Sequence, residues 1–161
     1  NFDSDYNEVR LSDLLLACSA IKGYFNPVAI NGRSLSDGVT VMKNPSLIAY
    51  EHYKAIFPND ELILLSMGTG DVSTFYDDEI EKSVIEIDQR LKEISEHNPM
   101  LKYYRIQPKL KFAKPDMSDT SPENIENLLI DAQKYLTYNS DLIDQIATDL
   151  KRPKVDPGKT G

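Results

Sequence analysis

The amino-acid sequence predicts an α/β layered domain, because segments with strand character alternate with segments of helical periodicity. Residues 61–67 form a nearly continuous apolar run that ends in Gly-Thr-Gly, which suits a strand buried on both faces of a parallel sheet. Apolar residues at positions 80, 84, 87, 91 and 94 form one stripe of an amphipathic helix. No composition break divides the chain. We therefore expect one domain over residues 1–150 and a disordered tail over residues 151–161, which are charged and rich in Pro and Gly.

The first third of the chain predicts a helix and a hairpin. A helix is expected over residues 9–22, and Pro27 then breaks the pattern. Residues 28–30 and 33–35 flank Asn31 and Gly32, a pair that suits the type I′ turn of a β-hairpin. A second tight turn is expected where Asp37 precedes Gly38.

The middle of the chain supplies the expected core. Pro45 is placed to open a helix that continues to about residue 56, and the strand at residues 61–67 follows. The amphipathic helix is expected over residues 76–97, since Asn98 and Pro99 end it. Two further strands are expected on either side of Pro108, at residues 103–107 and 110–112.

Two helices are expected at the end of the domain. Ser121 is a suitable N-cap for the first, with Pro122 at its first helical position. Its expected buried face consists of Ile125, Leu128, Leu129, Ala132 and Leu136. Ser140 or Asp141 caps the second, whose apolar residues are Leu142, Ile143, Ile146 and Leu150.

The net charge and the cysteine content argue against several classes of function. The formal net charge of −8 argues against nucleic-acid binding, which needs cations to neutralise phosphate, and against simple electrostatic docking on anionic lipid. The single cysteine, Cys18, excludes an internal disulfide, and its apolar surroundings favour a buried structural thiol over a nucleophile. We expect no signal peptide and no membrane span, and a cytoplasmic or peripheral membrane location.

Six short motifs occur in one order along nearly the whole chain. They are residues 19–27 (a Ser-Ala segment leading to an aromatic pair and Pro), Asp37-Gly38, residues 43–45 (Lys-Asn-Pro), residues 66–70 (Ser-Met-Gly-Thr-Gly), residues 104–107 (Tyr-Arg-Ile-Gln) and the helix entry at residues 117–124. In this order they resemble the patatin-like family of lipid acyl hydrolases. The resemblance implies a three-layer sandwich with a mostly parallel sheet (the FabD/lysophospholipase-like fold), of which only the C-terminal part is present.

The resemblance implies a catalytic role for Asp37. In the family, an Asp on an Asp-Gly-Gly turn is the acid of a Ser-Asp dyad, and the nucleophilic Ser lies on a Gly-x-Ser-x-Gly elbow. That elbow and the family's Gly-rich oxyanion loop belong upstream of the region seen here, and neither occurs in this chain, which begins without Met. Ser34 is only a near match to the elbow, because the last Gly is missing and a hairpin is expected there.

The expected function is therefore that of the C-terminal portion of a phospholipase A or lysophospholipase. The implied partners are a lipid or acyl-ester substrate, transient contact with a membrane surface, and a missing N-terminal half of the domain, in the same chain or as a separate one. Alone, the chain is expected to be inactive, and no cofactor or metal is implied. The alternative is a non-catalytic lipid- or protein-binding module with a degenerate patatin fold. Val39, where the family has a second Gly, and Lys43, where it has an Asn, favour that alternative.

Other motifs fit structural roles better. His52 and His97 could suggest a catalytic triad or a metal site, but both lie on an expected helix and lack Cys/His ligand spacing. The acidic residues 77–79 fit a first helical turn better than a cation site. Residues 157–160 lack the earlier Gly of a phosphate-binding loop, and residues 68–70 lack the third Gly of a nucleotide loop.

Overall fold

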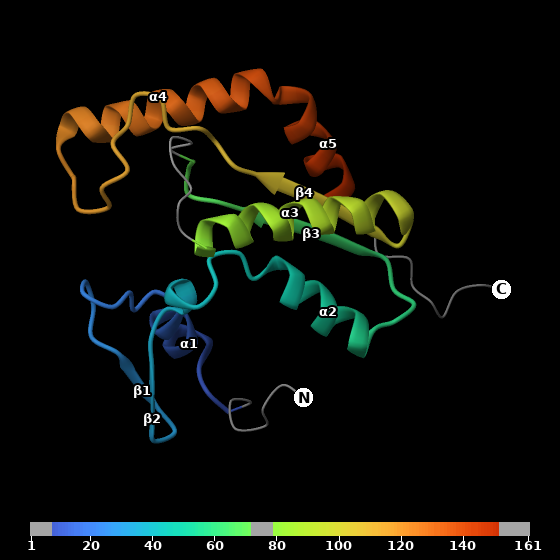
Figure 1. Cartoon of the computed structure of the whole chain (residues 1–161), viewed down its shortest axis with the longest axis horizontal. Coiled ribbons are helices and arrows are strands. Elements are labelled where there is room, and N and C mark those ends of the chain that lie inside the picture. The colour runs from blue at the N-terminus through green and yellow to red at the C-terminus, as the bar shows by residue number, and fades with distance from the viewer. Residues whose placement is uncertain (1–7, 72–78, 152–161) are drawn as a thin grey trace.

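A computed structural model describes residues 8–71 and 79–151, which form an α/β arrangement built around a parallel strand pair (Figure 1). The elements are, in order, α1 (Leu11–Cys18), β1 (Val28–Ile30), β2 (Arg33–Leu35), the 3-10 turn η2 (Gly38–Thr40), α2 (Ser46–Ile56), β3 (Leu62–Met67), α3 (Glu79–His97), β4 (Leu101–Ile106), α4 (Pro122–Tyr138) and α5 (Ser140–Leu150). The predicted α/β class is confirmed. The extent of the domain stays a prediction, and the expected tail lies almost wholly outside the described residues.

The N-terminal hairpin forms as predicted. β1 and β2 pair antiparallel with Val28 opposite Leu35. Asn31 has φ 49° and Gly32 has φ 75°, so both turn residues adopt the left-handed conformation that a type I′ turn requires. In Figure 1 the hairpin and α1 lie to one side of the β3–β4 pair.

β3 and β4 pair in parallel over six residues each, from Leu62 opposite Leu101 to Met67 opposite Ile106. Successive side chains of β4 contact different helices. The Tyr103 hydroxyl donates to Asp88 of α3 (3.0 Å), whereas Lys102 Nζ donates to Asp149 of α5 (2.7 Å). Because neighbouring side chains of a strand point to opposite faces, α3 lies against one face of the pair and α5 against the other. The full three-layer sandwich stays a prediction.

The amphipathic helix is confirmed as α3. Leu91, the fourth of the five residues of the predicted stripe, is fully buried, and Val84, Ile87 and Ile94 are half-buried. Residues 76–78 and the side chain of Ile80 lie outside the described part. Among the helices of residues 8–71 and 79–151, none combines the length and apolar character needed to cross a bilayer.

The strand expected at residues 110–112 is wrong. Among residues 8–71 and 79–151, an isolated bridge between Asp71 and Lys109 is all that continues the ladder beyond Pro108. The backbone N–H groups of Lys111, Phe112 and Ala113 instead donate to one carboxylate oxygen of Asp131, each at 3.0 Å. A side chain of α4 thus takes the donors that a neighbouring strand would need.

The expected inner face of α4 is also wrong. Ile125 is 46% exposed and Leu129 is 67% exposed, whereas the buried residues of the helix are Asn124 and Asp131. The inner side of α4 is polar because it accepts and donates hydrogen bonds for the loop that precedes it. The start of α4 is as predicted: Ser121 Oγ accepts from the N–H of Asn124 (3.3 Å), and Pro122 is the first helical residue.

Cys18 is exposed, so its expected role as a buried thiol is wrong. The helix that carries it is shorter than the expected residues 9–22, and its inward positions are taken by Ala17 and, just beyond it, Ala20. Leu15 and Leu16 are consequently turned outward with Cys18.

Candidate functional site

Asp37 lies between β2 and η2 and is held at both its backbone and its side chain. Its N–H donates to the carbonyl of Ala20 (3.0 Å), and its Oδ1 accepts from the N–H of Val39 (2.7 Å). The carboxylate therefore caps η2 and is half-buried. Within the described residues, its second oxygen, Oδ2, has no hydrogen-bond partner. The site thus presents one rigid carboxylate with a single free acceptor.

Gly38 has a smaller role in this turn than its motif suggests. Its φ lies outside the left-handed region, and a Cβ placed on it would meet no atom within 4 Å. Val39 contributes only its backbone N–H to the cap, which any residue except proline supplies. The replacement of the family's second Gly by Val39 therefore leaves the Asp37 turn intact.

A buried polar cluster follows Asp37 in the chain and joins the start of α2 to the sheet. Asn44 Oδ1 accepts from the N–H of Ser46 (3.2 Å), and Ser46 Oγ donates to Ser66 Oγ (2.7 Å). All three residues are buried, and Asn44 is only 1% exposed. Ser66 belongs to β3, so the cluster fastens the start of α2 to the carboxyl end of that strand. Open α/β sheets place ligands outside the carboxyl ends of their strands.

Arg105 extends this cluster across to β4. Its guanidinium donates through Nη1 to Ser66 Oγ (2.7 Å) and through Nη2 to Gln107 Oε1 (2.9 Å). The pair lies directly over Gly68, where a Cβ would stand 1.5 Å from Gln107 Oε1. A larger residue at position 68 would therefore displace the Gln107 side chain from its hydrogen bond with Arg105.

Asn44 is the one member of the cluster with an unsatisfied donor. Its amide nitrogen Nδ2 is buried and has no hydrogen-bond partner in the described part of the chain. A buried, unpaired amide donor costs about 1–3 kcal/mol, so such a group needs an explanation. Sequence reasoning quoted Asn44, Ser66 and Arg105 within motifs but gave them no role. A serine within the apolar strand β3 was the signal available.

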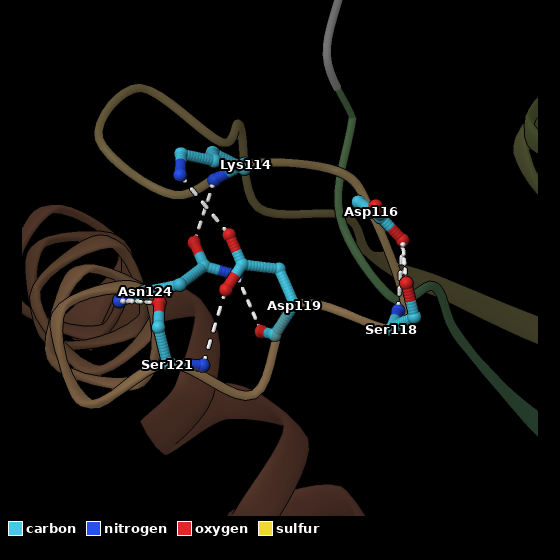
Figure 2. A network of polar contacts seen from close by, with 6 residues as sticks. All are labelled: Lys114, Asp116, Ser118, Asp119, Ser121 and Asn124. Carbon is cyan, nitrogen blue, oxygen red and sulfur yellow. Dashed lines mark hydrogen bonds and ion pairs between the residues drawn. The ribbon is translucent and has the colours of Figure 1, made fainter.

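A second polar network lies in the loop before α4 (Figure 2). Asn124 Oδ1 accepts from the N–H of Lys114 (2.8 Å), and Asn124 Nδ2 donates to the carbonyl of Asp119 (3.0 Å). Asp119 also accepts from the N–H of Ser121 and from Lys114 Nζ, each at 3.1 Å. The hydrogen bonds from Ser121 and then Lys114 lower the pKa of Asp119 to about 2.

This network borders a cavity of about 270 Å³ between the loop, the first turns of α4 and the segment after β3. Thr69 and Gly70 contribute to its wall, in line with the expectation that residues 68–70 form a turn lining a cleft. Gly70 has φ 125°, and a Cβ there would lie 2.8 Å from Leu110. The groups of Lys114, Asp119, Ser121 and Asn124 in Figure 2 hydrogen-bond to one another, so the network fixes the loop.

Ser34, His52 and His97 do not form a catalytic arrangement in the structure. Ser34 is exposed in the middle of β2, which is not a strand-to-helix elbow. His52 and His97 are both exposed, and His97 Nδ1 lies 2.8 Å from the carbonyl of Glu93. Residues 8–71 and 79–151 hold no group of three His, Cys, Asp or Glu side chains that could bind a metal ion. Asp77, Asp78 and residues 157–160 lie outside the described residues, and Glu79 begins α3.

Two features of the structure are compatible with a fragment of a patatin-like domain. One is the parallel β3–β4 pair with helices against it, and the other is the capped Asp37, which precedes β3 in the chain. Two curated proteins match this chain in sequence. The chain is 26% identical to calcium-independent phospholipase A2-gamma of Rattus norvegicus over 161 residues, which cover 91% of this chain and 20% of that protein. It is 24% identical to the protein of the same name from Mus musculus over 162 residues, with the same coverage.

The chain spans about a fifth of the length of these relatives. It is a distant homologue of both phospholipases, which supports the resemblance to the patatin-like family drawn from its motifs. No family model matches the chain, and no solved structure matches it.

Proposed function

We propose that this chain is the C-terminal portion of a serine lipid acyl hydrolase of the phospholipase A or lysophospholipase type. Asp37 is the acid of its Ser-Asp dyad, and the nucleophilic Ser lies in a part of the domain that precedes residue 1. The observation that carries the proposal is the state of Asp37. One carboxylate oxygen is held by the N–H of Val39, and the other has no partner in the described residues.

Two further observations support it. The six family motifs occur in order, and the two distant relatives are calcium-independent phospholipases. The Asn44–Ser46–Ser66 cluster also fixes the segment that follows η2 against β3. The cap holds the Asp37 carboxylate, and the cluster holds the segment that follows η2. A catalytic base needs rigid support of this kind.

In the proposed reaction, the Ser hydroxyl loses its proton to Asp37 as its oxygen forms a bond to the ester carbonyl carbon. The ester bond to the lipid alcohol then breaks, and the alcohol oxygen takes the proton from Asp37. Water repeats the sequence on the acyl-enzyme, releases the fatty acid and restores the Ser. The Val39 N–H keeps the Asp37 carboxylate oriented throughout.

The substrate is a lipid acyl ester presented at a membrane surface, and the protein is cytoplasmic or bound peripherally to that surface. Without the preceding half, residues 1–161 are inactive alone. A second candidate is a non-catalytic lipid- or protein-binding module. The cap itself favours it, because Asp37 already has a structural role at the start of η2 that requires no catalysis.

The substitution Asp37→Asn separates the two candidates, because asparagine caps a helical turn as well as aspartate does but is a poor base. In the polypeptide encoded by the complete gene, the proposal expects hydrolysis of a fluorogenic phospholipid to fall by about 10²–10⁴-fold with an unchanged melting temperature. Ser34→Ala is the matched control in the same hairpin region, and its activity should equal that of the wild type. An Asp37→Asn protein of full activity removes Asp37 from the mechanism and leaves the cap as its role.

A further inference from the structure

Asn44 carries a buried hydrogen-bond donor that no described residue pairs. The residue is 1% exposed, and its Nδ2 has no partner among residues 8–71 and 79–151. The orientation of the amide is fixed by Ser46, whose N–H donates to Asn44 Oδ1 (3.2 Å), because a reversed amide would place a donor against that N–H. The unpaired group is therefore a donor, and it needs an acceptor oxygen.

Arg105 lies beside the same part of the cluster. Ser66 Oγ accepts from Arg105 Nη1 (2.7 Å) and donates to Asn44 Oδ1 (3.5 Å), so the guanidinium and the amide meet at one hydroxyl. The other acceptor of Arg105, Gln107 Oε1, is also neutral, and no ion pair of the described residues includes Arg105. A guanidinium has more N–H donors than these two bonds use. A half-buried cation of this kind favours an anion beside it.

The start of α2 adds positive potential at the same place. Ser46 is the first residue of α2, and its Oγ donates to Ser66 Oγ (2.7 Å), so the helix begins beside the hydroxyl that Arg105 contacts. α2 has no side-chain cap and no acidic residue in its first turn. The N-terminus of a helix is the positive end of its dipole and favours negative charge. Three features that favour an anion thus meet near the carboxyl end of β3.

We propose that Arg105, Asn44 and the first turn of α2 form a binding site for a phosphate group. A phosphate offers more acceptor oxygens than a carboxylate, and these point in different directions, which suits donors on separate segments of the chain. This chemistry has two sources, the head group of a phospholipid and a free phosphate ion. The first source rests on the proposed function, whereas the site itself does not.

Isothermal titration calorimetry with inorganic phosphate tests the site in the polypeptide encoded by the complete gene. The proposal expects saturable binding to the wild type. Arg105→Gln keeps a donor for Ser66 but removes the charge, and it should weaken this binding by at least about 10-fold, because charge-assisted hydrogen bonds are the strong ones. Arg90→Gln is the matched control, since Arg90 is exposed on α3, and its affinity for phosphate should equal that of the wild type.

Circular dichroism establishes that each variant is folded. Where Arg105→Gln is not, Arg105→Lys takes its place, because lysine keeps the charge but loses the planar fork of donors and should bind phosphate more weakly than the wild type. Dihexanoylphosphatidylcholine, used below its micelle concentration, separates the two sources. Competition between this phospholipid and inorganic phosphate assigns the site to a head group, and phosphate binding without competition assigns it to the free ion.

Three results would overturn the proposal. The first is a wild type that does not bind inorganic phosphate at millimolar concentration. The second is an affinity that substitution of Arg105 leaves unchanged, which would place the bound phosphate elsewhere. The third is a wild type without phosphate binding whose melting temperature falls sharply in Arg105→Gln, which would assign the guanidinium to a carboxylate of the same polypeptide.

The calorimetric readout does not depend on hydrolysis. An inactive polypeptide that binds phosphate through Arg105 would refute the proposed function and leave this inference standing. An active polypeptide that binds no phosphate would refute this inference alone.

Discussion

Asp131 accepts three backbone hydrogen bonds on one carboxylate oxygen, and its removal should destabilise the fold. One carboxylate oxygen accepts from the N–H groups of Lys111, Phe112 and Ala113, each at 3.0 Å, and the residue is only 4% exposed. Burial acts to raise the pKa of this carboxyl. The N–H groups, that of Ala113 first, outweigh burial and leave the pKa below its ordinary value.

The cost of Asp131→Ala follows from these bonds. Three donors lose their acceptor at about 1 kcal/mol each, because a net hydrogen bond contributes about 0.5–1.5 kcal/mol. Alanine is the better helix former by about 0.5 kcal/mol, which offsets part of the loss. The net loss in the free energy of unfolding is about 2.5 kcal/mol, or a fall in melting temperature of about 5–10 °C. Asp131→Asn keeps a neutral acceptor and should lose about half as much.

Urea denaturation followed by circular dichroism measures these losses. Asp144→Ala is the matched control, since it removes an exposed carboxylate from the neighbouring helix and should change stability by less than about 0.5 kcal/mol. Amide exchange at Lys111, Phe112 and Ala113 should accelerate in Asp131→Ala. A loss no greater than that of Asp144→Ala would refute the view that this carboxylate holds the loop.

Two further predictions concern pH. Burial, and then the Asp88 carboxylate, raise the pKa of Tyr103 to about 12, so its contribution to stability is complete below pH 10 and is lost as the pH rises toward 12. An ultraviolet titration should show this late step, and Tyr103→Phe should remove it; a titration unchanged by the substitution would contradict the assignment. Hydrogen bonds from Lys102, and then Tyr104 and Gln145, lower the pKa of Asp149, so its contribution is present above about pH 4 and is lost as the pH falls further. The difference in melting temperature between wild type and Asp149→Asn should be constant above about pH 5 and shrink below pH 4; a constant difference throughout would count against it.

The sequence predicted the elements whose signals are local. The paired left-handed residues Asn31 and Gly32, the Ser121 cap and the apolar stripe around Leu91 each act within a few residues, and all three formed as expected. The parallel strand expected at residues 61–67 formed at residues 62–67, but its expected burial on both faces is wrong for the described residues, because Ser66 alone is buried and Met67 is 71% exposed.

The predictions from sequence are wrong where a side chain far along the chain determines the local structure. Residues 110–112 have strand character, but the carboxylate of Asp131, about twenty positions away, takes their backbone donors. That same role turns the polar side of α4 inward and leaves Leu129 outside. The spacing of apolar residues cannot show that the buried face of a helix consists of polar residues that form hydrogen bonds.

The candidate site was predicted in part. The position of Asp37 on a tight turn is confirmed by its cap on η2, whereas its catalytic role stays a prediction. The cluster of Asn44, Ser46 and Ser66 could not be derived from spacing, because its members lie on segments that meet only in the folded chain.

The most direct test of the account is fluorophosphonate labelling of the polypeptide encoded by the complete gene, with the modified residue located by mass spectrometry. The account predicts one labelled Ser, outside residues 1–161, and labelling slowed by at least about 100-fold in Asp37→Asn. The absence of any labelled Ser, or a label on a residue within this chain such as Ser34, would contradict it.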